Sequence, residues 1–182
     1  MPRATIDELC VACDDGDLRL VSKLLRRDGS LVDKSDSEDW TPLTCACARG
    51  YKQMVRLLLK MGASINLPMS NGCTPLNIAC QCDHEATARL LLDKGASIDL
   101  AHNNDATPLF IACHDCHEST VLLLLDKGAS IDLALNDCST TLYIASQSGY
   151  LPTVRLLLVP RPSSPHVPHG YCLPPSTTHH DY

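Results

Sequence analysis

The tripeptide Thr-Pro-Leu recurs along this chain at a fixed interval of thirty-three residues. It stands at 41–43, 74–76 and 107–109, and a changed copy, Thr-Thr-Leu, stands at 140–142. A period of this length indicates units of supersecondary structure that cannot bury their apolar face alone and must stack on their neighbours. The sequence therefore predicts a stack of similar units and excludes a fold with one central core.

Each unit is predicted to contain two short helices. After the tripeptide, apolar or small residues recur at i, i+3 and i+4, as in Leu43, Ala46 and Cys47, and this spacing forms one stripe on a helix. The Thr suits the N-cap, and the Pro suits the first helical position, where its missing N–H has no partner to lose. A second apolar run follows in each unit, such as Val55 with 57–59. In three units this run is followed by a glycine that can end a helix in the left-handed conformation, at Gly62, Gly95 and Gly128.

These residues resemble the ankyrin repeat, whose pattern runs Gly-x-Thr-Pro-Leu-His-x-Ala-Ala, then Gly-His, then Val-Val-x-Leu-Leu-Leu and Gly-Ala-Asp-Val-Asn. The resemblance covers about residues 6 to 159. It implies an all-α solenoid of stacked helix-turn-helix units with β-hairpin-like finger loops. On this reading, an N-terminal capping repeat and linker (1–38) precede three repeats (39–66, 67–99 and 100–132) and a truncated fourth (133–159).

The chain departs from the family pattern at two kinds of position. The family's His after Thr-Pro-Leu is replaced in each unit, by Thr44, Asn77, Phe110 and Tyr143. Gly50 and Gly149 keep the glycine that closes the first helix, but Asp83 and Cys116 take its place in the middle units. Because Cys tolerates a left-handed conformation poorly, we expect a strained or altered turn in the third unit.

Charge and hydropathy narrow the class of protein. The formal net charge is −6, so we expect no basic surface for nucleic acid or for an anionic membrane. The N-terminus shows no signal-peptide pattern, and the longest aliphatic run, 121–125, is far shorter than the roughly 20 residues that cross a bilayer. We expect a monomer of the cytoplasm or nucleus that is not secreted. Its eleven cysteines are then reduced thiols without a structural disulfide.

One cluster suggests a cofactor. The run Cys-His-Asp-Cys-His at 113–117 fits the attachment motif of c-type haem, and Cys80, Cys82 and His84 lie one repeat before it, which suggests zinc. The repeat register explains the same residues as packing and turn positions, with Cys47, Cys80 and Cys113 as small buried hydrophobes. We therefore expect no metal and no cofactor, and metal or haem binding remains a remote alternative.

Motifs for catalysis are missing from the sequence. It has no Gly-rich phosphate loop, nucleophile elbow or His-Glu-x-x-His. Asn66, Asp99 and Asp132 recur with the period, so we interpret them as turn formers and not as general acids. We expect a non-enzymatic protein.

The resemblance implies that a protein partner binds the concave face formed by finger tips and first helices. Carried over to this sequence, the partner-binding positions are Trp40, Arg49, Ser70, Asn71, Cys73, Gln81, Asn103, Asn104, His114, Asp115, Asn136, Asp137, Ser139 and Gln147. Trp40 is the best candidate for an anchor, since aromatic residues supply large contact area. Alternatively, Trp40 only shields the junction with the capping unit. The alternative function is a substrate-recognition or scaffold part of a kinase, ubiquitin-ligase or other signalling assembly, or a fragment of a longer ankyrin protein.

The C-terminal part differs from the rest. The segment 160–182 is rich in proline and histidine without apolar periodicity, which predicts disorder. A terminal repeat normally has a polar outer face, but 156–159 shows no such adaptation. We therefore expect either a frayed last helix or the product of a longer array that is cut short.

Overall fold

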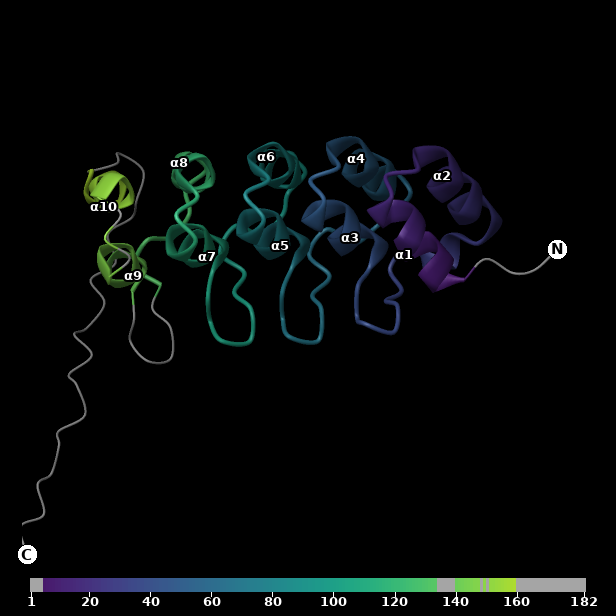
Figure 1. The fold of residues 1–182 in the computed structure, drawn as a ribbon, viewed down its shortest axis with the longest axis horizontal. Helices are drawn as coiled ribbons and strands as arrows, with labels where there is room; N and C mark the ends of the chain where they lie inside the picture. The colour runs from purple at the N-terminus through teal and green to yellow at the C-terminus, as the bar shows by residue number, and fades with distance from the viewer. Residues whose placement is uncertain (1–4, 134–139, 148, 150, 160–182) are drawn as a thin grey trace, which may run out of the picture.

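Ten α-helices and one 3₁₀ helix form the fold in the residues that the computed structural model describes, which are 5–133, 140–147, 149 and 151–159. The α-helices form five consecutive pairs: α1 (Ile6–Asp14) with α2 (Leu18–Arg27), α3 (Pro42–Ala48) with α4 (Lys52–Lys60), α5 (Pro75–Gln81) with α6 (Glu85–Asp93), α7 (Pro108–His114) with α8 (Glu118–Asp126), and α9 (Thr141–Gln147) with α10 (Leu151–Leu158). The 3₁₀ helix η1 (Gly29–Leu31) follows the first pair. Figure 1 shows the odd-numbered helices in one row, the even-numbered helices in a second row, and the finger loops on the side of the odd-numbered row. The predicted all-α solenoid is confirmed.

The repeated Thr begins the helix that follows it. The hydroxyl oxygens of Thr41, Thr74 and Thr107 each accept a hydrogen bond from the backbone N–H three residues later, at 3.2 Å. The next residue, Pro, occupies the first turn in all three helices, as predicted. In α3 and α5 the side chain at the third helical position returns a hydrogen bond to the Thr backbone, which completes a capping box. In α7 that position is Phe110, which has no side-chain acceptor, and the box is absent.

The turn after each first helix keeps one geometry although its residue changes. Gly50, Asp83 and Cys116 have φ values of 68°, 54° and 60°. The backbone hydrogen bonds of the turn are also alike, with Gly50 N to Cys47 O at 3.1 Å and Cys116 N to Cys113 O at 3.3 Å. The third unit therefore retains an unaltered turn, and the expected strain lies in the left-handed backbone of Cys116.

A continuous apolar core runs along the stack between the two rows of helices. It contains a leucine from each helix of the central repeats, and all of these are fully buried: Leu43, Leu58, Leu76, Leu91, Leu109 and Leu124. Cys47, Cys80 and Cys113 are 0% exposed, which confirms their predicted role as small buried residues. Each layer packs on the next through its first helix, with α1 against α3, α3 against α5, α5 against α7 and α7 against α9.

Polar side chains also join each repeat to the next. At the base of the fingers, carboxylate or amide oxygens accept from the backbone N–H of a serine one repeat later: Asp33 from Ser64, Asn66 from Ser97, and Asp99 from Ser130, at 2.8, 2.9 and 3.0 Å. Asn66 and Asp99, which the sequence suggested as turn formers, thus connect neighbouring repeats.

Each finger up to the third repeat is a hairpin-like loop. It is closed by one backbone hydrogen bond from an N–H to the carbonyl four residues later: Asp36 to Trp40, Met69 to Cys73, and His102 to Ala106, at 3.0, 2.9 and 3.2 Å. A residue with positive φ allows the reversal in each case, namely Asp39, Gly72 and Asp105. The fingers therefore share one turn geometry, with a left-handed residue at the same position in each.

The last helix pair leaves large apolar side chains in contact with solvent. Leu151, Leu158 and Val159 are 65%, 62% and 54% exposed. This agrees with the lack of polar adaptation noted at 156–159. The predicted disorder of 160–182 concerns residues outside the described part of the chain. No helix in the described residues is long and apolar enough to cross a membrane.

Candidate functional site

The predicted partner-binding residues lie on the side of the molecule that carries the finger loops and the odd-numbered helices (Figure 1). Most of them are solvent-exposed: Arg49, Ser70, Asn71, Gln81, Asn103, Asn104, His114 and Gln147. Trp40, Cys73 and Asp115 are half-buried. Asn136, Asp137 and Ser139 lie outside the described residues. The structure thus places the described members of the set on one continuous side.

Several of the predicted fingertip residues bind the neighbouring finger. The backbone N–H of Asn103 donates to the Asn71 carbonyl at 3.0 Å, and the Asn103 side-chain amide donates to the Ser70 carbonyl at 2.9 Å. The Ser70 backbone N–H donates in turn to Asp39, and this hydrogen bond lowers the pKa of the Asp39 carboxyl. These contacts hold the fingertips in fixed relative positions.

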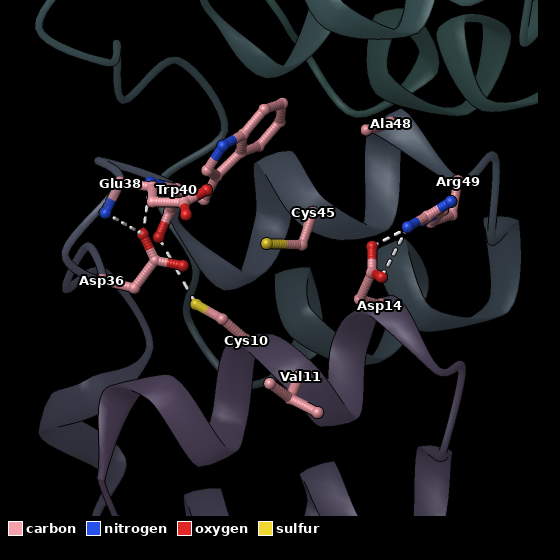
Figure 2. Close-up of a pocket in the computed structure, with 9 residues that line it drawn as sticks. All are labelled: Cys10, Val11, Asp14, Asp36, Glu38, Trp40, Cys45, Ala48 and Arg49. Carbon is pink, nitrogen blue, oxygen red and sulfur yellow. Dashed lines mark hydrogen bonds and ion pairs between the residues drawn. The ribbon is translucent and has the colours of Figure 1, made fainter.

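A hollow of about 400 Å³ opens on this side between the N-terminal helix pair and the first repeat. Figure 2 shows the residues around it: Cys10, Val11, Asp14, Asp36, Glu38, Trp40, Cys45, Ala48 and Arg49. They come from α1, from α3 and its C-cap, and from the loop that joins η1 to α3. It is therefore formed jointly by the N-terminal helix pair and the repeat that packs on it.

Trp40 is positioned in the hollow by its backbone. Its N–H donates to Asp36 Oδ1 at 2.9 Å, and its carbonyl accepts from the Cys10 thiol at 3.4 Å. The half-buried indole packs partly against the core and also lines the hollow. The backbone of Trp40 thus closes the junction with α1, while its side chain lines the hollow.

Arg49 forms the opposite wall with Asp14 (Figure 2). The guanidinium donates two hydrogen bonds to the carboxylate, from Nε to Oδ1 at 2.5 Å and from Nη2 to Oδ2 at 2.6 Å. The hydrogen bonds from Arg49 lower the pKa of Asp14. Both side chains are well exposed, so solvent screens the pair and its effect on stability is small. Its main effect is to fix Arg49 across the α1–α3 junction.

The repeated helix pairs with their finger loops are matched by a known family. The pattern of the family "Ankyrin repeats (3 copies)" matches residues 9–102 and again residues 97–167. The chain belongs to the ankyrin-repeat family. Among curated proteins, no match to this chain is found.

The Cys/His residues of the middle ankyrin repeats have structural partners. His84 Nε2 donates to the Ala48 carbonyl and His117 Nε2 donates to the Gln81 carbonyl, both at 3.0 Å. Cys113 is buried in the core, and Cys116 occupies the turn. Within the described residues, these side chains do not gather into a group that could hold a metal ion.

A basic groove lies on the other row of helices, between α2 and α4, with a volume of about 900 Å³. It is lined by six cationic residues and no acidic one: Arg19, Lys23, Arg26, Arg27, Arg56 and Lys60. Except for Arg27, these side chains make no ion pair with the described residues. The expectation of no basic surface is wrong for this face, because the net charge of −6 is a sum over the whole chain. The basic surface does not continue onto α6, because Arg89 there forms an ion pair with Glu85.

The sequence reading missed the residues that the N-terminal helix pair contributes to the hollow. Cys10 and Asp14 on α1 were not predicted as site residues because α1 has no Thr-Pro-Leu to set its register, and Asp36 in the loop before α3 was not predicted either. The spacing of the leucines carried the necessary signal. Leu9 corresponds to Leu43, which assigns Cys10 to the first helix of the capping unit. Because α1 packs on α3, Cys10 then lies next to Cys45.

Proposed function

We propose that this chain is a non-enzymatic interaction module that binds a protein partner through the finger-loop side of its ankyrin stack. The observation that carries the proposal is the hollow between the N-terminal helix pair and the first repeat, where a half-buried Trp40 forms one wall and a fixed Arg49 the opposite one. Trp and Arg, with Tyr, are the residues most enriched among those that dominate binding energy at protein interfaces. An apolar or aromatic side chain of the partner would enter the hollow and pack on the indole.

Two further observations support a binding role. Hydrogen bonds between fingers fix the edge beside the hollow, which reduces the entropy that binding must overcome.

Burial raises the pKa of Cys13 and of Cys113 to about 12, so these side chains stay as thiols at neutral pH and are weak nucleophiles. A chain with so many thiols suits the reducing cytoplasm or nucleus.

The test is a Trp40→Ala variant with a matched control. Tyr143 is a second exposed aromatic residue, at 55%, and it lies far along the stack on α9. The partner is first identified by affinity capture and then measured with purified proteins. We expect Trp40→Ala to weaken binding by about thirtyfold, the equivalent of ~2 kcal/mol at an interface hot spot. Tyr143→Ala should bind as the wild type does.

Equal melting temperatures of the two variants and the wild type would show that the fold is intact. If Trp40→Ala binds every captured partner as tightly as the wild type, the hollow is not the binding site and the proposal is wrong.

The basic groove favours a second binding function, in which an acidic segment of a protein occupies the outer side of α2 and α4. Leu18 and Leu57 add apolar surface to the groove, so a segment with acidic and apolar residues suits it. Long polyanions suit it less well, because the remainder of the chain carries a net negative charge that repels them. Two faces that bind different segments would make this chain a scaffold, which fits the alternative of a part in a larger signalling assembly.

This second function is tested with a labelled Glu/Leu-rich peptide, single-stranded RNA and anionic vesicles. We expect the peptide to bind with an affinity that falls as salt rises, and to lose binding in a Lys23→Glu, Arg56→Glu variant. Lys127→Glu, a charge change on the distant α8 end, should leave binding unchanged. Preference for RNA or vesicles over the peptide, or no binding of any of them, would refute the proposal.

A further inference from the structure

Two cysteines and one aspartate converge at the base of the hollow, although they are far apart in the sequence. Cys10 comes from α1, Cys45 from α3, and Asp36 from the loop before α3. The two sulfur atoms and a carboxylate oxygen all lie within 4.8 Å of one another. Figure 2 shows the three side chains directed toward a common space. No other such group of metal-ligating side chains occurs in the described part of the chain.

From this geometry we propose that Cys10, Asp36 and Cys45 bind a zinc ion that ties the first helix pair to the second. Zinc prefers tetrahedral coordination with Zn–S bonds of about 2.3 Å and Zn–O bonds of about 2.0–2.2 Å, which places its ligand atoms about 3.5–3.8 Å apart. The three ligand atoms here lie within 4.8 Å of one another, so side-chain rotations that shift them by about 1 Å would bring them to that spacing. Two sulfur ligands select zinc over magnesium and calcium, which prefer oxygen.

Asp36 is oriented as a metal ligand would need to be. Its Oδ1 atom accepts hydrogen bonds from the backbone N–H groups of Glu38 and Trp40, both at 2.9 Å. Its Oδ2 atom receives no hydrogen bond from the described residues and remains available. Hydrogen bonds that orient a ligating carboxylate are typical of the shell around protein metal sites.

The ligand set leaves the fourth coordination position open. Cys10 and Cys45 are only 4% and 7% exposed, so the sulfur side of the site is shielded from water. The hollow of about 400 Å³ borders all three residues and gives the ion a path from solvent. A water molecule in the hollow would complete the coordination.

Charge in the cluster also favours a cation. The Asp36 carboxylate lies beside the two thiols and brings negative charge to the cluster. The titratable groups that face Cys10 are Cys13 on α1, Asp36 in the loop and Cys45 on α3. Zinc would displace the thiol protons and compensate the negative charge that results, so its affinity should rise with pH.

The structural consequence is a crosslink at the end of the stack. The three ligands belong to α1, α3 and the segment that carries Trp40, whose backbone already contacts Cys10 and Asp36. Zinc would therefore hold the N-terminal helix pair on the next repeat and fix Trp40. Because zinc binds only the folded arrangement, it should raise the melting temperature.

The experiment uses the full chain, reduced with a phosphine and freed of metal, and titrated with Zn²⁺ and with Co²⁺ as a spectroscopic probe. We expect one equivalent of Zn²⁺ by dialysis and metal analysis, a higher melting temperature, and a sulfur-to-cobalt charge-transfer band. Cys10→Ser and Cys45→Ser should abolish the band. Cys82→Ser is the matched control, since Cys82 is exposed and distant, and it should behave as the wild type.

A conservative variant keeps the test valid if a buried serine disturbs the fold. Asp36→Asn retains the Oδ1 acceptor for both backbone N–H groups but replaces Oδ2 with an amide nitrogen that does not bind zinc. We expect an unchanged far-UV spectrum and a zinc affinity at least about tenfold weaker. The proposal is wrong if the reduced chain binds no zinc, if these variants bind it as the wild type does, or if Cys10 and Cys45 are joined as a disulfide in the protein isolated from cells.

Discussion

Asn77 carries the most instructive polar defect in the core. It is 1% exposed, and its Oδ1 accepts from the backbone N–H of Thr74 at 3.0 Å. Its Nδ2 group is buried and has no hydrogen-bond partner. Thr44 occupies the same position one repeat earlier. The Thr44 hydroxyl accepts from the Thr41 N–H at 2.8 Å and donates to the Thr41 carbonyl at 2.9 Å, so it leaves no orphaned donor.

We therefore expect Asn77→Thr to stabilise the protein. A buried donor without a partner costs about 1–3 kcal/mol, and Thr keeps the acceptor of the capping box while it removes that donor. Helix propensity does not oppose the change, since Asn and Thr are nearly equal on that scale. A net gain of about 1–2 kcal/mol corresponds to a rise of about 2–8 °C in melting temperature for a chain of this size.

The assay is thermal unfolding followed by far-UV circular dichroism, with urea unfolding as a second measure. The reciprocal variant Thr44→Asn is the matched control, because it should create the same orphaned amide in the preceding repeat and lower the melting temperature. If Asn77→Thr leaves the melting temperature unchanged or lowers it, the assignment of Asn77 Nδ2 as an unfavourable buried group is wrong.

Two other predictions concern the turn after the first helix and the pair beside the hollow. Gly50→Ala should destabilise the protein by at least ~1 kcal/mol more than Gly62→Ala, although both positions have positive φ. A Cβ at Gly50 would lie 2.6 Å from His84 Nδ1 and disturb the hydrogen bond of His84 to the Ala48 carbonyl, whereas a Cβ at Gly62 meets nothing within 4 Å. Equal loss of stability for the two variants in urea unfolding would contradict this. Arg49→Ala should raise the pKa of Asp14 toward its ordinary value of 3.8, measured by NMR titration. Since the folded-state pKa is the lower one, the small stabilisation from this pair is complete above pH ~3.8 and is lost as the pH falls through the folded-state pKa. An unshifted Asp14 in the variant would show that Arg49 is not the cause.

The period of the sequence was sufficient to predict the fold, because each unit repeats the same local signals. Thr-Pro at a helix start and apolar residues at helical spacing depend on neighbours close in the chain, so pattern reasoning finds them. The same reasoning placed Cys47, Cys80 and Cys113 in the core. It expected a strained or altered turn at Cys116, and the structure shows the unaltered turn with a left-handed backbone there.

What the sequence did not reveal depends on contacts between units. The connection from Asp99 to Ser130 spans one repeat, and nothing in either residue alone distinguishes it from a turn. The cluster of Cys10, Asp36 and Cys45 brings together three segments with no shared motif. The basic groove arises because cationic residues at helical spacing on α2 and α4 lie on one side of two adjacent helices, a local feature that total charge conceals.

Native-state hydrogen exchange tests the central claim that each layer depends on the neighbours that cover it. We expect the slowest exchange in α3 to α8, which have a helix pair on either side, and the fastest in α9 and α10, where Leu151 and Leu158 are exposed. Uniform protection from α1 to α10, or the strongest protection in α9 and α10, would contradict the account.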